Sequence, residues 1–471
     1  PTTYSFMNSI AIAIPNGRTD ISIADVHFKK GLDINLIGEA KKVLEPAPKS
    51  KFYSVEPSDF HGINPKLNVK ISDNILAGDI LFYDKSDELL KFASPVSGQI
   101  TEIIRGEKRK ILSIKILADE NQVFKNSGCL KTSANKDDII EFLLSVGCWP
   151  FIMQRPYAII ANYKSSPKSI FVSGYSSEPL SADLDFTLKD NRKEIQAAVS
   201  ILNKLTEGKV NVSIEKSSDS IFREINDIEL YNVSGPHPSG NVGSLINKVD
   251  PVNKGESVWT VSAQDLVIIG NMILTGEFKA ERIVSLSGSS IKSPKYLKTT
   301  IGCQIDSITN NNIHNLNNNN RIISGTILSG KKVESDGHLD YYSNSITVIP
   351  EGDDYELFGW TKPVFNKVSV SRALTFSWLF PKKKYDLTTN TNGEHRAFVT
   401  TGTYEKVFPL DIFPMHILKA CMYNDLDEME ALGMYEVAPE DFALTEFVCV
   451  SKQPHQKIIR EGLDLMKKEI G

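Results

Sequence analysis

The chain has 471 residues, which is enough for about three domains of ordinary size. Its composition, 41% hydrophobic and 24% charged, is that of a globular protein and excludes a wholly disordered chain. The formal net charge of −5 argues against a general nucleic-acid-binding protein, which usually carries a basic stripe. No apolar run reaches the roughly 18 residues that a membrane-spanning helix requires, so the sequence predicts none.

The N-terminus and the cysteines bear on the cellular compartment. The residue pattern of 1–25 does not resemble that of the remainder of the chain, and we expect these residues to be an extension that is disordered or left over from cloning. They lack the basic start and apolar core of a secretory signal. The five cysteines are scattered, which excludes a closely spaced iron–sulfur or zinc motif and fits a reducing cytoplasm. They are Cys129, Cys148, Cys303, Cys421 and Cys449.

Residues 26–125 alternate short apolar segments with Gly, Asp and Pro turns. Ile80–Phe82 and Ile111–Leu117 have the pattern of short strands, and Gly78-Asp79 has that of a turn. Such spacing is typical of a small all-β sandwich or barrel. Together with Ala93–Ile100, the pattern is similar to the barrel-sandwich hybrid of lipoyl and biotinyl carriers. The sequence therefore predicts a barrel-sandwich hybrid (lipoyl-like) domain at 26–125.

Residues 126–260 change to a strand–helix–strand pattern. Ile170–Ser173 is an apolar strand, Asp190–Leu205 has apolar residues at helical spacing, and Val210–Ile214 is a second strand. This order is the repeating unit of a parallel sheet. We therefore expect a Rossmann-like α/β domain here.

The rest of the chain is predicted as two further parts. Residues 261–325 are interpreted as a β-grasp (SLBB-like) module, with the asparagine-rich stretch at 310–320 as a solvated loop. Residues 326–471 are expected to be β-rich and then helical. One helix begins at Phe413-Pro414, with one face marked by Met415, Leu418, Met422, Leu426 and Met429. The last helix follows Pro454, with one side formed by Ile458, Ile459, Gly462 and Met466.

Motifs for independent chemistry are missing. No Gly-x-Gly-x-x-Gly and no Gly-x-Ser-x-Gly occurs, and the histidines form no pair at zinc-helix spacing. The segment Gly325–Lys332 approaches a phosphate loop, but Lys332 replaces the Ser or Thr that would hold Mg²⁺, and the pattern favours a β-hairpin. We therefore predict no catalytic and no metal-binding residue.

Six segments, in order along the chain, carry a family resemblance. They are Lys30–Ile34, Ala93–Ile100, Gln154–Pro156, Gly235–Gly240, Asn392–Arg396 and Val437–Leu444. From about residue 26 to the end, the chain resembles the A subunit of the bacterial sodium-translocating NADH:quinone oxidoreductase. Each motif is weak alone, but six in the family order are strong.

The resemblance implies a peripheral protein on the cytoplasmic face of the inner membrane. It implies docking on the membrane-embedded B subunit of a six-subunit complex, near the end where quinone is reduced. The complex oxidises NADH, reduces quinone and exports Na⁺. It also implies no cofactor in this chain, with FMN, FAD, riboflavin and iron–sulfur clusters in other subunits. Two alternatives remain open: a standalone flavin- or lipoyl-type enzyme, and a ligand-binding module.

Two groups of residues are candidate contact sites. Aromatic residues beside lysines suit a membrane or subunit interface, because rings favour the headgroup region and ammonium groups favour anionic lipid. That group is Phe376, Trp378, Leu379, Phe380, Lys382, Lys383 and Lys384, for which a buried aromatic hairpin with a solvated basic end is the alternative. In the second group, the turn Gly235–Gly240 has an unusual backbone and a histidine that can hydrogen-bond. There the candidate quinone or partner contacts are Gly235, His237, Ser239 and Gly240, although a structural corner is the simpler interpretation.

Overall fold

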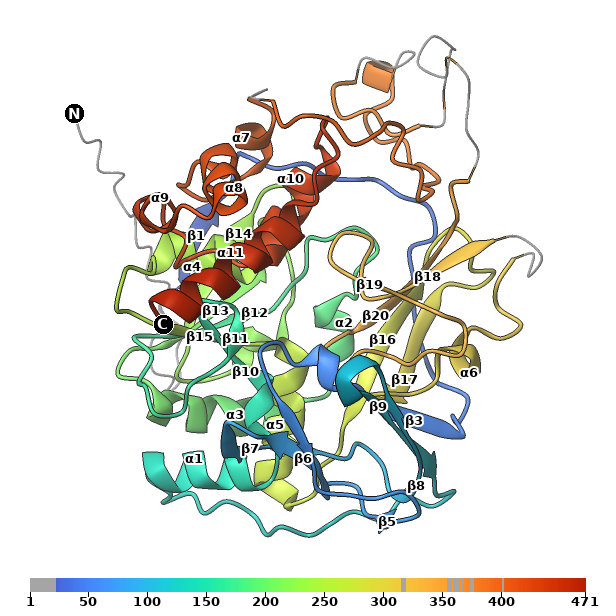
Figure 1. The fold of residues 1–471 in the computed structure, drawn as a ribbon, viewed down its shortest axis with the longest axis vertical. Coiled ribbons are helices and arrows are strands. Elements are labelled where there is room, and N and C mark those ends of the chain that lie inside the picture. Colours follow the sequence, from blue (N-terminus) through green and yellow to red (C-terminus); the bar gives the residue numbers. More distant parts are fainter. Residues whose placement is uncertain are drawn as a thin grey trace.

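The computed structural model describes residues 23–314, 319–353, 358, 365, 367–372, 377–399 and 402–471. Four sheets and a C-terminal group of helices form its framework (Figure 1). In the view of Figure 1 the small β-domain lies at the bottom and the C-terminal helices lie at the top. This mixed architecture agrees with the predicted fold class.

The small β-domain consists of two antiparallel sheets that face each other across an apolar core. Phe82 and Phe92 are 0% exposed and their rings stack with centroids 4.6 Å apart, because alternate residues of β6 and β7 point inward. The four-stranded sheet contains, in order, β3 (Phe52–Val55), β9 (Ile111–Ala118), β8 (Gly98–Arg105) and β5 (Asn74–Ile75). The three-stranded sheet contains β4 (Pro65–Leu67), β6 (Ile80–Asp84) and β7 (Asp87–Ala93), and the short helices are η1 (Pro57–Asp59) and η2 (Glu107–Arg109).

A seven-stranded sheet forms the α/β domain, and its first five strands run parallel. In spatial order they are β1 (Ile23–His27), β14 (Glu229–Ser234), β13 (Val210–Glu215), β12 (Ile170–Ser173) and β15 (Val258–Val261). β10 (Ile152–Arg155) and β11 (Ile159–Ile160) complete the sheet in antiparallel pairing. Ile23–Asp25, which the sequence analysis assigned to the extension, are the first residues of β1.

Helices cover both faces of this sheet. On one face lie α1 (Lys136–Ser145), α2 (Leu184–Leu188), α3 (Arg192–Leu205) and α5 (Ala263–Thr275), with the short helices η3 (Trp149–Phe151) and η4 (Ile221–Glu224). The predicted helix at 190–205 is confirmed as α3, and its Ile195, Val199 and Leu202 are fully buried. α5, which the prediction placed in the β-grasp module, packs against α3 because Gly270 lets the two helix backbones approach closely.

The third sheet belongs to the β-grasp region but draws strands from distant parts of the sequence. Its order is β19 (Lys331–Val333), β18 (Asn320–Ser324), β20 (Ser345–Pro350), β16 (Glu281–Ser287), β17 (Lys295–Thr300) and β2 (Lys41–Pro46), and α6 (Ile305–Thr309) lies beside it. The predicted β-hairpin at Gly325–Lys332 is confirmed, since β18 and β19 pair antiparallel.

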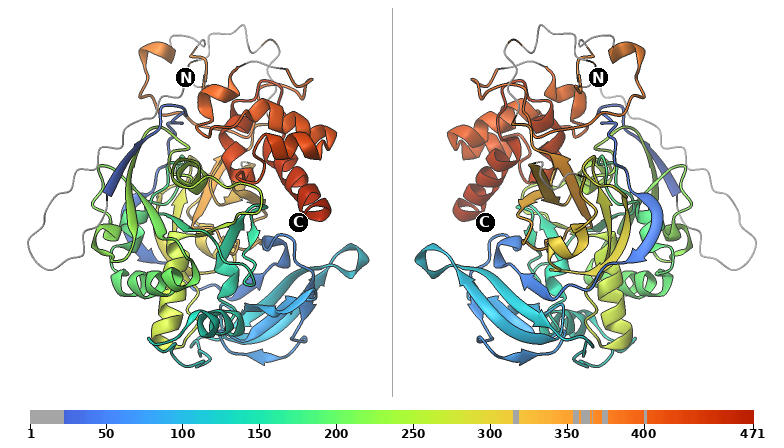
Figure 2. Two further views of the ribbon diagram at one scale, coloured as in Figure 1. Left: turned by 90° about the vertical axis from the view of Figure 1, so that its left-hand side faces the viewer. Right: turned by 90° about the vertical axis from the view of Figure 1, so that its right-hand side faces the viewer.

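The C-terminal helices cover the other face of the seven-stranded sheet (Figure 2). With α4 (Val242–Val249), they are α7 (Tyr404–Val407), α8 (Pro414–Tyr423), α9 (Leu426–Ala431), η7 (Pro439–Phe442), α10 (Ala443–Phe447) and α11 (His455–Glu469). The predicted single face from Met415 to Met429 is wrong. Asn424 takes a left-handed conformation that ends α8 before α9 begins, and Met422 is 44% exposed. The predicted face of α11 is buried as expected.

Among the described residues, no helix combines the length and the apolar content that crossing a bilayer would require.

Candidate functional site

The turn Gly235–Gly240 directly follows β14, at the carboxyl edge of the parallel strands. Its main chain is tied to the segment after β1: the amide of Leu32 donates to the carbonyl of His237 at 2.8 Å, and the amide of His237 donates to Asp33 Oδ1 at 2.9 Å. Asp33 and His237 lie 204 positions apart in the sequence, so two of the family-like motifs meet in space. The turn is a junction between chain segments.

Glycine is required on both sides of this junction. Gly31 has φ +147°, and a Cβ placed there would lie 2.2 Å from the carbonyl oxygen of His237. Gly235 has φ +129°, and its Cβ would lie 2.3 Å from the carbonyl oxygen of Phe28. Both the backbone conformation and the close approach exclude a side chain. The motif glycines therefore serve the contact between the two segments.

His237 is buried within this junction. It is 1% exposed, and its Nδ1 lies 3.0 Å from Ser177 Oγ, which also accepts a hydrogen bond from the amide of Gly240 at 2.8 Å. Burial lowers the pKa of His237 to about 4, so the ring is neutral near pH 7. Ser239 is 2% exposed and donates to the carbonyl of Gly235 at 2.9 Å. The structure thus brings all four predicted residues of this turn together, with His237, Ser239 and Gly240 buried and Gly235 exposed.

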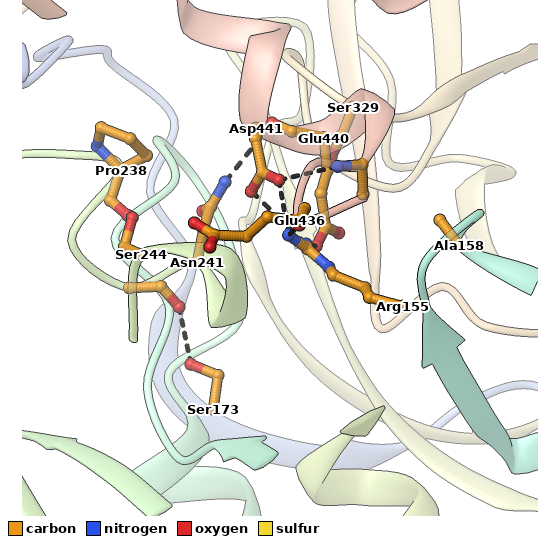
Figure 3. A network of polar contacts seen from close by, with 12 residues as sticks. Arg155, Ala158, Ser173, Pro238, Asn241, Ser244, Ser329, Glu436, Glu440 and Asp441 are labelled. Atoms are coloured by element: carbon orange, nitrogen blue, oxygen red, sulfur yellow. Dashed lines mark hydrogen bonds and ion pairs between the residues drawn. The ribbon is translucent and has the colours of Figure 1, made fainter. Parts of the chain in front are cut away.

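A second junction joins two more motifs through Arg155 (Figure 3). Arg155 ends β10 and its side chain is 3% exposed, while the Asp441 side chain in η7 is 0% exposed. Arg155 Nη1 donates to Asp441 Oδ2 at 2.7 Å and to the carbonyl of Glu436 at 2.8 Å, and Nη2 donates to Glu440 Oε1 at 2.9 Å. Burial disfavours the guanidinium charge, but attraction to Asp441 and Glu440 outweighs it and raises the pKa of Arg155. The pair ties the C-terminal helices to the sheet.

Glu440 is the most exposed acid of this cluster. Its side chain is 47% exposed, so solvent screens its carboxylate more than that of Asp441. Partial removal from solvent raises the pKa of Glu440 above its ordinary value; Arg155 opposes this shift, and the charges of Asp441 and Glu178 add to it. Glu440 is therefore easier to protonate than an isolated glutamate.

The near-phosphate-loop hairpin binds a carboxylate of the chain itself. Ser329 Oγ donates a hydrogen bond to Oε1 of Glu178, a residue of the loop after β12, at 3.0 Å. The carbonyl of Leu328 accepts a hydrogen bond from Nε2 of Gln456, in α11, at 3.0 Å. Burial raises the pKa of Glu178, and hydrogen bonds from Thr326 and Ser329 lower it. The hairpin thus joins the β-grasp region to the α/β domain and to α11.

A cavity of about 680 Å³ opens beside these junctions, at the carboxyl ends of β12 and β13. Ligands of open α/β sheets commonly bind at such an edge. Its wall carries the carboxylates of Glu39, Glu178, Asp183, Asp185, Glu215 and Asp219 and the ammonium groups of Lys42, Lys189 and Lys384. Quinone sites are mainly apolar, so this charged wall does not have the character expected of one.

The predicted aromatic and lysine residues that the structure describes are largely exposed, in contrast to the buried His237. Trp378 is 61%, Leu379 50% and Phe380 62% exposed, around the short helix η6 (Ser377–Leu379). Phe376 lies outside the described residues. Lys382 is exposed, Lys383 Nζ donates to the carbonyl of Phe365 at 2.6 Å, and Lys384 forms an ion pair with Glu39 at 2.8 Å. We call the described part of this group, Ser377–Lys384, the aromatic–basic segment.

The two predicted groups are linked by one stretch of chain. The segment that holds His237 through Leu32 and Asp33 continues to Ile37, whose amide donates to the carbonyl of Tyr385 at 3.0 Å. The amide of Tyr385 in turn donates to the carbonyl of Asn35 at 2.9 Å. The base of the aromatic–basic segment is therefore fixed to the same extended stretch that fixes the turn.

Sequence reasoning missed the roles of Arg155, Glu440 and Asp441, although their motifs contributed to the family resemblance. An arginine after an apolar strand and an acidic pair after Pro439 were the available signals. Neither signal identifies the partner, because the two segments are separated by more than half of the chain. Within the ranges that the structure describes, no three His, Cys, Asp or Glu side chains gather in a way that would hold a metal ion.

The fold and these junctions define a multidomain protein in which a barrel-sandwich hybrid, an α/β domain and a β-grasp module are tied together by C-terminal helices. Family models match three of these parts. "NqrA N-terminal barrel-sandwich hybrid domain" matches residues 26–119, "NqrA second alpha/beta domain" matches 134–278, and "NQRA C-terminal domain", an SLBB model, matches 283–335.

Curated relatives extend the match to nearly the whole chain. A protein of Marinomonas sp. (strain MWYL1) is 34% identical over 93% of this chain and 99% of its own length. A protein of Haemophilus influenzae is 34% identical over 94% of this chain and 100% of its own length. A protein of Neisseria meningitidis serogroup A is 33% identical over 94% of this chain and 100% of its own length. All three are named as the A subunit of the Na(+)-translocating NADH-quinone reductase. A chain of an NAD⁺-reducing [NiFe]-hydrogenase, with TM-score 0.33 and 11% identity over 46% of this chain and 47% of its own, is too distant to support an argument.

The chain therefore belongs to the NqrA family, the A subunits of the Na⁺-translocating NADH-quinone reductase. The predicted family and the predicted fold class are both confirmed.

Proposed function

We propose that this chain is the A subunit of a complex that oxidises NADH, reduces quinone and exports Na⁺. The proposal rests on sequence similarity over nearly the full length of both aligned chains. Relatives with this name align over 93–94% of this chain and 99–100% of their own length. A match of that extent retains every domain, so the chain has the parts that such a protein uses.

Within the complex we assign the chain a scaffolding role at the cytoplasmic face of the bacterial inner membrane. It docks peripherally on the membrane-embedded B subunit, near the quinone-reduction end. The architecture supports this role, because the motifs that it shares with the family hold domains together: Arg155 binds Asp441, and Gly31 packs on His237. Rigid domains present a fixed docking surface, which a multi-subunit electron-transfer complex requires.

We further propose that the chain holds no cofactor of its own, and that FMN, FAD, riboflavin and iron–sulfur clusters reside in other subunits. The scattered cysteines and the missing glycine-rich loop support this. An absorption spectrum of the purified full-length chain tests it. A flavin band or an iron–sulfur band that survives dialysis would favour the alternative of a standalone enzyme.

The experiment for the main proposal is complementation. In a bacterium whose own gene for the A subunit is deleted, this chain should restore NADH-driven quinone reduction and Na⁺ uptake into inverted membrane vesicles. An affinity tag on the chain should copurify the B subunit. Restored electron transfer without that copurification would contradict the docking. No restoration, despite a folded and expressed chain, would contradict the function.

Quinone contact at Gly235, His237, Ser239 and Gly240 remains a prediction. His237 is 1% exposed, so we propose that it acts by holding the loop after β12 through Ser177. His237→Gln in the assembled complex separates the two roles. A raised KM for quinone with unchanged stability would favour contact, whereas lowered stability with unchanged KM would favour the holding role.

A further inference from the structure

The region around the aromatic–basic segment has a composition unlike that of the rest of the chain. Residues 357–385 contain six Lys or Arg and no Asp or Glu, although the whole chain has 58 acidic and 53 basic residues and a net charge of −5. The same 29 positions contain seven aromatic residues, among them two of the four tryptophans. Positive charge and aromatic rings are therefore concentrated together in one short part of an otherwise acidic chain.

Apolar side chains of this region are exposed rather than buried. Trp149 and Trp259 are 0% exposed in the core, whereas Trp378 is 61% exposed. Five more large apolar residues between 358 and 380 are 36–62% exposed: Phe358, Phe365, Val370, Leu379 and Phe380. Trp378, Leu379 and Phe380 are consecutive, so these three exposed apolar side chains form one contiguous group, which is a mark of an interaction surface.

The positive groups lie directly beside these apolar side chains. Pro381 and Lys382 follow Phe380 and are exposed, and Lys383 lies 5.5 Å above the ring of Tyr385. The base of the segment is held by the hydrogen bonds between Tyr385 and the Asn35–Ile37 stretch. In Figure 1 the described part of the segment projects at the upper end of the molecule, away from the small β-domain. A fixed base and a projecting aromatic tip are suited to contact with a flat surface.

We propose that the aromatic–basic segment, with Phe365, whose carbonyl accepts from Lys383, binds the surface of a bilayer that contains anionic phospholipid. Aromatic side chains favour the headgroup level, where the ring is apolar and its surroundings are partly wet, and ammonium groups favour the negative surface potential. The absence of acidic residues from 357–385 fits an anionic lipid surface, because no carboxylate is present there to be repelled by its negative surface potential. This inference rests on the proposed function, since it names the lipid as a partner of the proposed peripheral protein.

The test is co-sedimentation of the purified full-length chain with phosphatidylcholine vesicles that contain about 30% phosphatidylglycerol. Each lysine near an anionic surface strengthens binding roughly fivefold. Because Lys384 is already paired with Glu39, the triple variant K382Q/K383Q/K384Q should bind roughly 10- to 100-fold more weakly. Raising the salt from about 0.05 M to about 0.5 M should weaken the wild type and affect the variant less.

A matched control lies in the small β-domain. Lys108, Arg109 and Lys110 are all exposed, at the turn between β8 and β9. K108Q/R109Q/K110Q changes the net charge by the same amount and should keep wild-type binding. Trp378→Ser should reduce the blue shift of tryptophan emission on vesicle addition but not abolish it, because Trp149 and Trp259 are buried in the core and contribute little, while Trp360 is also part of residues 357–385. Thermal unfolding of each variant shows whether it is folded.

Three results would overturn the proposal: no binding of the wild type to the anionic vesicles, equal losses in the two triple variants, or wild-type binding by the folded K382Q/K383Q/K384Q variant. A variant that keeps vesicle binding but no longer copurifies with the B subunit would assign the segment to a protein partner instead. That result rejects the lipid contact and leaves the proposed function intact, whereas failed complementation by the wild type rejects the proposed function whatever the vesicles show.

Discussion

The Arg155 junction and the aromatic–basic segment both contain basic side chains, but the two sites place them in opposite environments. At the junction, the Arg155 and Asp441 side chains are 3% and 0% exposed and satisfy each other. In the segment, Trp378 and Phe380 are more than half exposed, and Lys382 lies in solvent. The junction belongs to motifs that carry the family resemblance, and the segment does not. The comparison teaches that the motifs at the junctions hold the architecture together, while the exposed aromatic and basic side chains lie between these motifs.

The largest effect is expected at the junction. Arg155→Met leaves Asp441 buried without its partner, and breaking a buried ion pair from one side costs about 3–5 kcal/mol. Urea unfolding followed by circular dichroism measures it. The control is Lys254→Met, which breaks the exposed pair with Glu430 across the same interface and should leave the midpoint nearly unchanged. Equal losses would show that the buried pair has no special role.

A pH-dependent effect is expected from the buried His237. Its pKa falls from 6.5 to about 4 on folding, so below pH 6.5 the unfolded chain binds a proton that the folded chain does not. Stability is therefore lost as the pH falls from 6.5 to 4, by about 3 kcal/mol at pH 4 from this group. His237→Gln should flatten that part of the profile of unfolding free energy against pH.

A second histidine provides an internal comparison for that experiment. His455 is 0% exposed, and burial lowers its pKa to about 4 in the same way. The double variant His237→Gln, His455→Gln should flatten the profile further than either change alone. An unchanged slope in the folded variants would mean that these rings are accessible to protons in the folded protein.

A smaller effect is expected from the backbone of the turn. Gly235→Ala combines a positive φ with a Cβ that would lie 2.3 Å from the carbonyl oxygen of Phe28, so about 1–3 kcal/mol should be lost. Gly255→Ala is the control, because Gly255 has φ +82° and open space around it. Both variants place an alanine at a positive φ, so the difference between their thermal midpoints measures the cost of the steric contact with Phe28. Equal midpoints would show that the junction can move apart to accept the added Cβ.

The smallest effect on stability is expected in the aromatic–basic segment. Trp378→Ser removes a side chain that is 61% exposed, so the free energy of unfolding should stay within about 0.5 kcal/mol of the wild type. Leu89→Ser, at a residue 53% exposed in the small β-domain, is the matched control. A loss of more than about 1 kcal/mol (twice the expected scatter) confined to Trp378 would place this residue in a structural role and weaken the comparison.

Local patterns predicted the elements well where one short segment determines the outcome. The helical spacing of Ile195, Val199 and Leu202 indicated α3, and the turn at Gly325–Gly330 indicated the hairpin. Patterns failed where tertiary contacts decide. The sequence does not show that α8 ends at Asn424, or that β2 pairs with β17, about 250 positions away. Nor does it show that Arg155 reaches Asp441, since long-range partners leave no periodic signal.

By itself, the sequence determined the family, the kinds of domain and the clustering of aromatic and basic residues at 376–384, because motifs, periodicity and uncompensated charge are properties of neighbouring residues. Only the tertiary structure decided that His237, Ser239 and Gly240 are buried, that Glu178 and Arg155 join separate domains, and that β1 completes the parallel sheet. These outcomes depend on which distant surfaces pack together. Burial and pairing are set by that packing and not by any segment alone.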